Sequence, residues 1–200
     1  MKGSLIIIVF FILGITTSHF QLLPERLSEG NLSLYALCGL MFCVGISIGA
    51  DPNTLLSFRK LNPRFTLLPV VTIVGTLTGC TVASLFLPSL HTVECCAIGS
   101  GMGYYSLSTI IISQYKGAEL GTIALLSNIL REITVLIAAP LLLRLFGPLA
   151  PISVGGATTM DTTLPIISQT CGQKYIIISI FHGCVTDFSV TFLVTLFCSI

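Results

Sequence analysis

Long apolar stretches follow one another along almost the whole of this 200-residue chain, with only short polar connections between them. A helix needs about 20 apolar residues to cross the hydrocarbon core of a bilayer. Only 8% of the side chains are charged, whereas a soluble domain has about 25%, so the chain lacks the polar surface to cover a water-facing globule. We therefore expect an all-α, polytopic membrane helical bundle that forms a single integral membrane domain over residues 1–200.

The charge balance and the cysteines exclude several other classes of protein. The net charge is +1, so the chain carries no excess of positive charge for binding a nucleic acid. Most of the eight cysteines lie inside apolar runs without C-x-x-C or zinc-type spacing, where thiols behave as small hydrophobic side chains. No phosphate-binding P-loop motif is present. We expect no metal, no cofactor and no nucleic-acid partner.

Residues 1–90 are predicted to form three transmembrane helices, at residues 3–21, 32–50 and 65–87. The loop at 51–64 holds the largest basic cluster, which places this loop in the cytoplasm by the positive-inside rule. This orientation puts the N-terminus inside and the C-terminus outside. Two glycine pairs at the spacing that allows close helix approach lie in the second and third runs: Gly45 and Gly49, and Gly75 and Gly79.

Two later segments, 91–113 and 151–168, are long and apolar but carry residues that interrupt helices. Glycine in a helix interior costs about 1 kcal/mol relative to alanine, so closely spaced glycines predict a break. In the first segment the residues at the predicted break are Gly99, Gly101, Gly103, Tyr104 and Ser106. In the second segment Gly155 and Gly156 are expected to open it, Thr162 to lie in its polar centre, and Pro165 to close it.

Each broken segment is followed by a long apolar run, at 120–145 and 175–200, so residues 91–145 and 150–200 form two copies of one unit. An offset of about 57 residues aligns the broken segments, and an offset of about 55 aligns Glu132 with Asp187 in the long runs. If the broken segments span the membrane, the two units are parallel. If they are re-entrant, the units are inverted, which is the common transporter arrangement and the one that we favour.

Charged residues near the middle of apolar runs predict a functional site. A charge at the centre of a membrane helix costs about 2.5–3.5 kcal/mol on insertion scales. The candidate substrate- or proton-binding residues are Glu132, Asn128 one turn before it, Asp161, Asp187 and Arg131. Two structural alternatives stay open: Arg131 serves only as an ion-pair partner of Asp187 or Asp161, and His182 serves only as a hydrogen-bonded packing residue.

Unwound backbone beside these acids favours a particular kind of ligand. Half-helix N-termini attract a carboxylate, and the acids attract a cation. This combination fits a zwitterionic or cationic amino acid. An intramembrane enzyme built on Asp161 and Asp187 is rejected because the wider motifs of such proteases are absent.

Several motifs resemble the LysO-type lysine exporter family. They are the run of residues 99–108, Asn128-x-x-Arg131-Glu132, the run of residues 155–165, and His182-Gly183. The resemblance implies export of L-lysine across the bacterial inner membrane, with a functional acid at Glu132. Full-length members carry further helices before the position where this chain begins, so the resemblance also implies a small membrane partner that supplies them.

These observations together predict a secondary transporter subunit in the lipid bilayer. It would export L-lysine and similar cationic amino acids, with the proton favoured as the coupling ion. The alternatives are a passive cation-selective pore, or an exporter of another amino acid or small organic ion, with sodium as a possible coupling ion.

Overall fold

The computed structural model describes residues 63–200 together with a few single positions before them: Leu13, Gly14, Thr16, Thr17, Phe20, Phe42 and Ile46. The chain divides into two compact units, Met1–Ser47 and Ile48–Ile200, and the account below concerns the second. Of the three membrane helices predicted for residues 1–90, only the third lies among the described residues. The single membrane domain over residues 1–200 stays a prediction.

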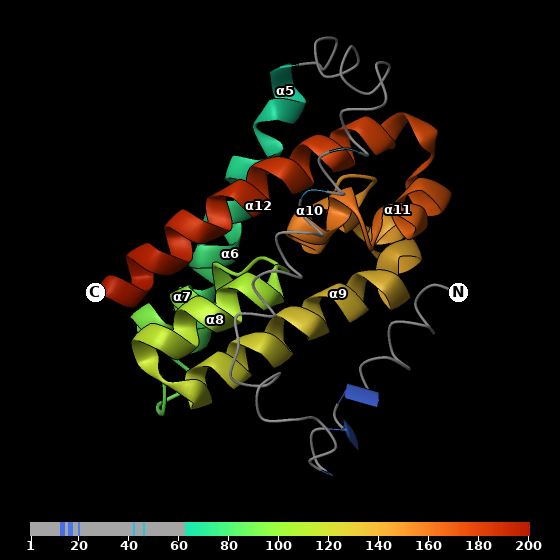
Figure 1. The fold of residues 1–200 in the computed structure, drawn as a ribbon. Helices are drawn as coiled ribbons and strands as arrows, with labels where there is room; N and C mark the ends of the chain where they lie inside the picture. The colour runs from blue at the N-terminus through green and yellow to red at the C-terminus, as the bar shows by residue number, and fades with distance from the viewer. Residues whose placement is uncertain (1–12, 15, 18–19, 21–41, 43–45, 47–62) are drawn as a thin grey trace. The chain divides into compact units, whose positions relative to one another are not determined.

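Every regular element within residues 63–200 is helical, which confirms the all-α class for this part of the chain (Figure 1). The elements are α5 (Pro63–Thr66), α6 (Leu68–Ser84), α7 (Thr92–Gly99), α8 (Tyr105–Lys116), α9 (Ala118–Phe146), α10 (Ala150–Gly155), the 3-10 helix η1 (Gly156–Met160), α11 (Leu164–Cys171), the 3-10 helix η2 (Gln173–Tyr175) and α12 (Ile176–Ser199).

Hydropathy marks one membrane-spanning candidate among the described residues. The helical stretch Gln173–Ser199 has the length and apolar character of a bilayer span, and Leu68–Ser84 is a shorter apolar helix. The third predicted run, 65–87, corresponds to α5 and α6.

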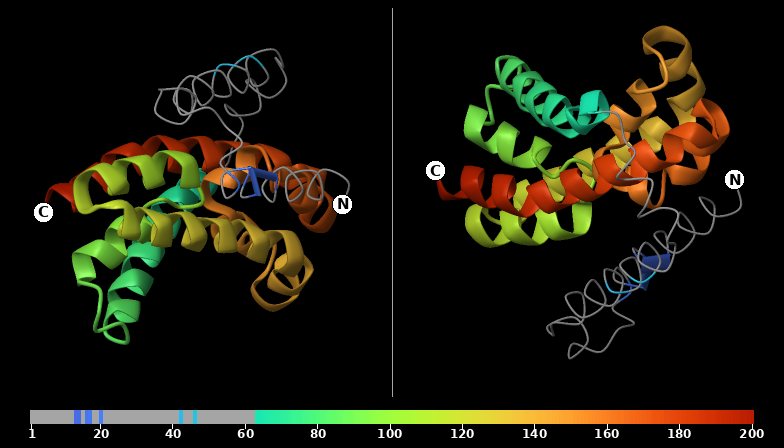
Figure 2. Two further views of the ribbon diagram at one scale, coloured as in Figure 1. Left: turned by 60° about the horizontal axis from the view of Figure 1, so that its bottom comes forward. Right: turned by 90° about the horizontal axis from the view of Figure 1, so that it is seen from above.

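The first broken segment folds as a helical hairpin. Helix α7 ends at Gly99, and α8 starts at Tyr105 and runs back toward the end of the bundle from which α7 came (Figures 1 and 2). The interruption therefore lies among the closely spaced glycines. Gly103 has a φ of +94°, which L side chains rarely adopt.

The second broken segment folds in the same way from the opposite end of the bundle, with its interruption between Gly155 and Pro165. Gly155 is the last residue of α10, and η1 follows from Gly156. Pro165 lies in the first turn of α11, where the α-helix resumes. A proline at this position lacks only an N–H that a first turn leaves unpaired, so it starts helices well.

The two long helices α9 and α12 run in opposite directions, and both hairpins pack against both of them (Figures 1 and 2). A glycine joins each hairpin to its long helix: Gly117 before α9 and Gly172 before η2 and α12, each with a φ of +96°. These glycines are 55 residues apart, which is the offset that aligns Glu132 with Asp187.

Two apolar cores lie toward opposite ends of this arrangement. One joins α7 and α8 to the first half of α9 and the second half of α12: Ala97, Ile98, Met102, Ile112, Leu120, Ala124, Val190, Val194 and Cys198. The other joins α10 and α11 to the second half of α9 and the first half of α12: Val135, Ala139, Ile152, Ile167 and Ile178. Buried polar side chains lie along the long helices between these cores, including Asn128, Glu132, His182 and Thr186.

A glycine on α12 allows η1 to approach this helix closely. A Cβ atom at Gly183 would lie 2.6 Å from the backbone nitrogen of Met160, and a Cβ at Gly75 on α6 would meet nothing within 4 Å.

We expect Gly183→Ala to lower the apparent melting temperature in detergent, since overpacking costs about 1–3 kcal/mol. Gly75→Ala is the matched control and should leave stability unchanged or slightly raised. Equal melting temperatures for Gly183→Ala and wild type would contradict the close packing.

Candidate functional site

The two helix interruptions meet directly in the middle of the bundle. The backbone amide of Ala157 in η1 donates to the carbonyl of Met102 at 2.9 Å. A Cβ atom at Gly156 would clash with the same carbonyl, and Gly156 has a φ of +62°. The approach of the two unwound segments therefore requires glycine at position 156.

Asn128 on α9 braces the first interruption. Its side-chain oxygen accepts from the amide of Gly103 at 2.8 Å, and its side-chain nitrogen donates to the carbonyls of Ile98 at 3.3 Å and Ala124 at 2.9 Å. The amide group is buried and bonded to backbone on both sides. Asn128 thus shares the Glu132 face of α9, as predicted, but it holds the glycine turn in place.

Arg131 on α9 braces the second interruption from another side. Its Nε donates to the carbonyl of Val154 at 2.7 Å, and its Nη2 donates to the carbonyl of Ser153 at 3.2 Å and contacts the hydroxyl of Thr76 at 3.5 Å. These carbonyls lie at the C-terminal end of α10, where a helix carries partial negative charge. Arg131 forms no salt bridge with any acid among the described residues, so the structural ion pair with Asp187 or Asp161 is wrong.

His182 on α12 is a packing residue with hydrogen bonds on both ring nitrogens. It is fully buried, with Nε2 at 2.9 Å from the Thr72 hydroxyl and Nδ1 at 3.3 Å from the Thr159 hydroxyl. Thr72 also contacts the hydroxyl of Ser153 at 2.7 Å. This network links α6, α10, η1 and α12.

Three acids gather beside the interruptions. Glu132 is only 7% exposed and accepts a hydrogen bond from the Thr162 hydroxyl. Asp161, in the turn between η1 and α11, accepts from the Thr162 amide at 2.5 Å. Asp161 interacts electrostatically with both Glu132 and Asp187, so carboxyls from α9, the second interruption and α12 share one region.

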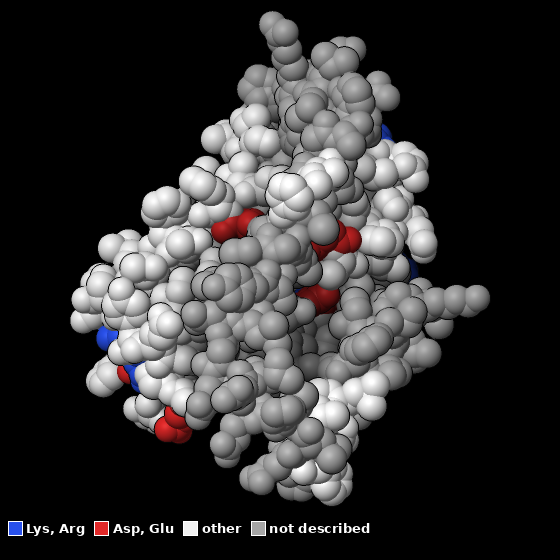
Figure 3. Space-filling view, viewed as in Figure 1, with Lys and Arg blue, Asp and Glu red and all other residues white. Residues whose placement is uncertain are grey.

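Among residues 63–200, no Lys or Arg forms a salt bridge with these acids. On the face drawn in Figure 3, red acidic side chains lie near the middle and also at the lower left, and the visible Lys and Arg lie at the margins, away from the central acids. Such a concentration of negative charge attracts a cation. The arrangement suits an ammonium group better than a nucleophilic reaction, because no activated nucleophile accompanies the acids in the described residues.

The remaining predicted residues lie around the interruptions. Gly99 packs against Cys80 of α6, and Gly101 packs against Asn128 and Ser108. Tyr104 closes the turn with an amide that donates to the Gly101 carbonyl at 2.6 Å. Ser106 is half-buried in the first turn of α8.

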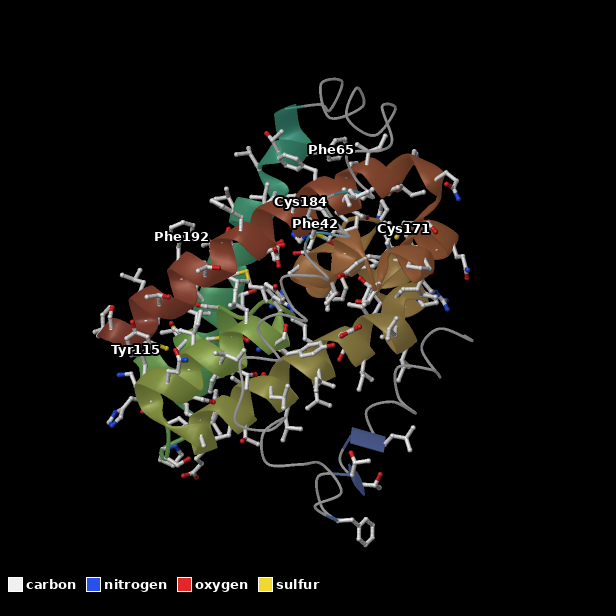
Figure 4. The ribbon with its side chains drawn as sticks, in the orientation of Figure 1. Phe42, Phe65, Tyr115, Cys171, Cys184 and Phe192 are labelled. Carbon is white, nitrogen blue, oxygen red and sulfur yellow. The ribbon has the colours of Figure 1, made fainter. Side chains whose placement is uncertain are left out.

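Two residues near the acids were not among the predicted site residues. Tyr105, which starts α8, interacts electrostatically with Glu132 and Asp161. Cys184, on the middle stretch of α12 in Figure 4, interacts with Asp187 and Asp161. Tyr105 aligns with Thr162 at the offset of 57, so the internal repeat indicates a hydroxyl-bearing side chain at the equivalent position of both units.

The brace made by Arg131 can be tested by removing its charge. Arg131→Gln should leave the carbonyls of Val154 and Ser153 without their donor, and a buried unsatisfied polar group costs about 1–3 kcal/mol. We expect a lower apparent melting temperature in detergent. Arg144→Gln, at an exposed position near the end of α9, is the matched control and should change little. A melting temperature as high as that of the control would show that Arg131 does not hold α10.

Comparisons with known proteins agree with these features. The family model for lysine exporter LysO matches residues 8–198. The lysine exporter LysO of Escherichia coli is 30% identical over 192 residues, which cover 96% of this chain and 62% of the relative. A Haemophilus influenzae protein named "Putative lysine exporter" is 32% identical over 169 residues, which cover 84% of each chain. No solved structure matches. The chain belongs to the LysO lysine exporter family.

Proposed function

We propose that this chain is a membrane transporter subunit that exports L-lysine and similar cationic amino acids by exchange for protons. The observation that carries the proposal is the cluster of Glu132, Asp161 and Asp187 beside two helix interruptions, in a chain of the LysO family. The names of its relatives support amino-acid export. Membrane localisation follows from the family, and we assign the chain to the bacterial inner membrane with the N-terminus inside and the C-terminus outside.

Glu132 provides a site for an ammonium group of lysine. Glu132 is nearly buried, and the described residues bring no basic side chain that neutralises it. A buried carboxylate without a counter-ion is costly, so a substrate ammonium or a proton would stabilise it. Because both cations compete for the same negative charge, binding of one favours release of the other.

The interruptions provide backbone groups for the opposite end of the substrate. The first amides of α8 have no intrahelical partner, as at any helix start, and they lie beside Tyr105. Such amides attract a carboxylate. The donors and acids together suit a zwitterion with an additional cationic group.

The two hairpins are proposed to be re-entrant segments of an inverted repeat. Their entry from opposite ends, the antiparallel α9 and α12, and the equivalent glycines Gly117 and Gly172 all support this topology. One unit could then rock against the other around the meeting point of Met102 and Ala157.

A small membrane partner is proposed to complete the transporter. The chain spans about 62% of the length of the Escherichia coli relative. Efflux of radiolabelled lysine from vesicles, measured with and without such a partner, tests whether the chain needs one.

Substitution of Glu132 tests the proposed substrate site. Glu132→Gln keeps the size and hydrogen-bonding ability of the side chain but removes its charge, so lysine export should be lost while membrane insertion stays normal. Glu119→Gln, in the exposed first turn of the same helix, is the matched control and should export normally. Export of lysine by Glu132→Gln at the wild-type rate would contradict the proposed role of Glu132 in substrate binding. If the wild-type chain moves lysine only down its concentration gradient and without saturation, the chain is a passive pore rather than a transporter.

The topology can be tested by labelling with an impermeant thiol reagent. In a chain without native cysteines, single cysteines at positions 116 and 146 flank α9 at its two ends. The inverted arrangement predicts labelling from outside intact cells at position 116 and none at position 146. The reverse pattern would mean that both broken segments cross the membrane and that the repeats are parallel.

A further inference from the structure

The three acids have different surroundings, and this difference assigns them different tasks. We propose that Asp187 is the residue that carries the transported proton, whereas Glu132 and Asp161 hold the substrate ammonium. This inference rests on the proposed function, which it deepens by placing the proton on one carboxyl.

Glu132 and Asp161 both have hydrogen-bond donors that suit a charged carboxylate. The Thr162 hydroxyl donates to Glu132 and also lies within hydrogen-bonding reach of Asp161. The Thr162 backbone amide donates to Asp161. A single hydroxyl proton cannot serve both carboxylates fully, but an ammonium group has three N–H donors. These two acids therefore have room for a cation that would complete their hydrogen bonds.

Asp187 lacks such donors. Its Oδ1 is buried, and no described residue forms a hydrogen bond with it. A buried carboxylate oxygen without a donor is strongly disfavoured, whereas a protonated carboxyl loses far less on leaving water. The surroundings of Asp187 in this structure thus suit a neutral carboxylic acid.

The neighbours of Asp187 reinforce this assignment. Asp161 is the charged group that faces it from the turn after η1, and Cys184 faces it from its own helix. Other titratable groups on the helices packed against α12 interact with partners other than Asp187. Cys80 of α6 interacts with the α7 thiols and Arg131, Tyr105 of α8 with Glu132 and Asp161, and Lys116 of α8 with Cys198. Two carboxyls that interact in a buried region do not both ionise readily. Asp161, with its backbone donor, keeps the charge, and Asp187 keeps the proton.

This division gives an exchange in which charge balances. On the cytoplasmic side Asp187 releases one proton and becomes a carboxylate, which raises the negative charge beside Glu132 and Asp161 and favours binding of lysine. On the outer side one proton returns to Asp187, the negative charge falls, and lysine, with its net charge of one, leaves. One proton therefore enters for each lysine exported, and no other reactant is needed.

The test separates lysine exchange from proton-driven accumulation in inside-out membrane vesicles that contain the full chain. Exchange is measured as uptake of labelled lysine into vesicles preloaded with unlabelled lysine at equal pH. Accumulation is measured with an acidic lumen and no preloaded lysine. Asp187→Asn should continue to exchange lysine but should accumulate it no better than vesicles without the chain. Glu132→Gln should lose both activities.

Three results would overturn the assignment. Accumulation by Asp187→Asn at the wild-type level would show that the proton lies elsewhere, and loss of exchange in a normally inserted Asp187→Asn would make Asp187 a substrate residue. If Asp187→Asn fails to insert, Asp187→Glu decides. This variant keeps a carboxyl, so accumulation should persist with a shifted pH dependence, and an unshifted profile refutes the assignment. Failure of the wild-type chain to move lysine in either assay would instead refute the proposed function.

Discussion

Free backbone groups in the centre of an apolar bundle are the constraint on which the rest of this structure depends. Two helices are interrupted at the same place, and each interruption leaves amides and carbonyls without intrahelical partners. In a membrane no water competes to satisfy them, so irregular backbone persists only where protein groups or a cavity replace the lost hydrogen bonds. The bond between Ala157 and Met102 lets each interruption satisfy part of the other.

The polar residues of α9 follow from this requirement. Asn128 serves the first interruption through its amide, and Arg131, about one helical turn later, serves the second through its guanidinium. With these two side chains engaged in bracing, Glu132 is the polar residue of this stretch that remains directed to the acidic region. The cost of a partly buried arginine is offset by carbonyl oxygens at a helix C-terminus rather than by an acid. Among the described residues, Asp161 and Asp187 therefore have no permanent counter-ion, as the proposed export of a cation requires.

The sequence predicted the features that depend on local preferences. The glycines near residue 101 mark an interruption, and the bounds predicted for the two long runs lie within two residues or so of α9 and α12. Gly155 and Pro165 mark the second interruption, but glycine and proline can each begin or end a helix, so the exact bounds of α10 and α11 depend on the neighbouring turns. The hydrogen-bond partners of Arg131 could not be predicted from the sequence. They are backbone carbonyls of a segment about twenty residues away, and no pattern of side chains indicates them.

The two units solve the same packing problem with different residues, which explains why their sequence similarity is weak. At the offset of 55, Asn128 aligns with Gly183. In the first unit a side chain reaches from the long helix to the turn, whereas in the second unit the absence of a side chain lets η1 pack directly on α12. Substitutions that exchange a hydrogen bond for close contact erase sequence identity but keep the geometry. One turn later the two units agree again, because Glu132 and Asp187 both bring a carboxyl to the same acidic region. Under the proposed function, the role of that region constrains charge more narrowly than packing constrains the residues beneath it.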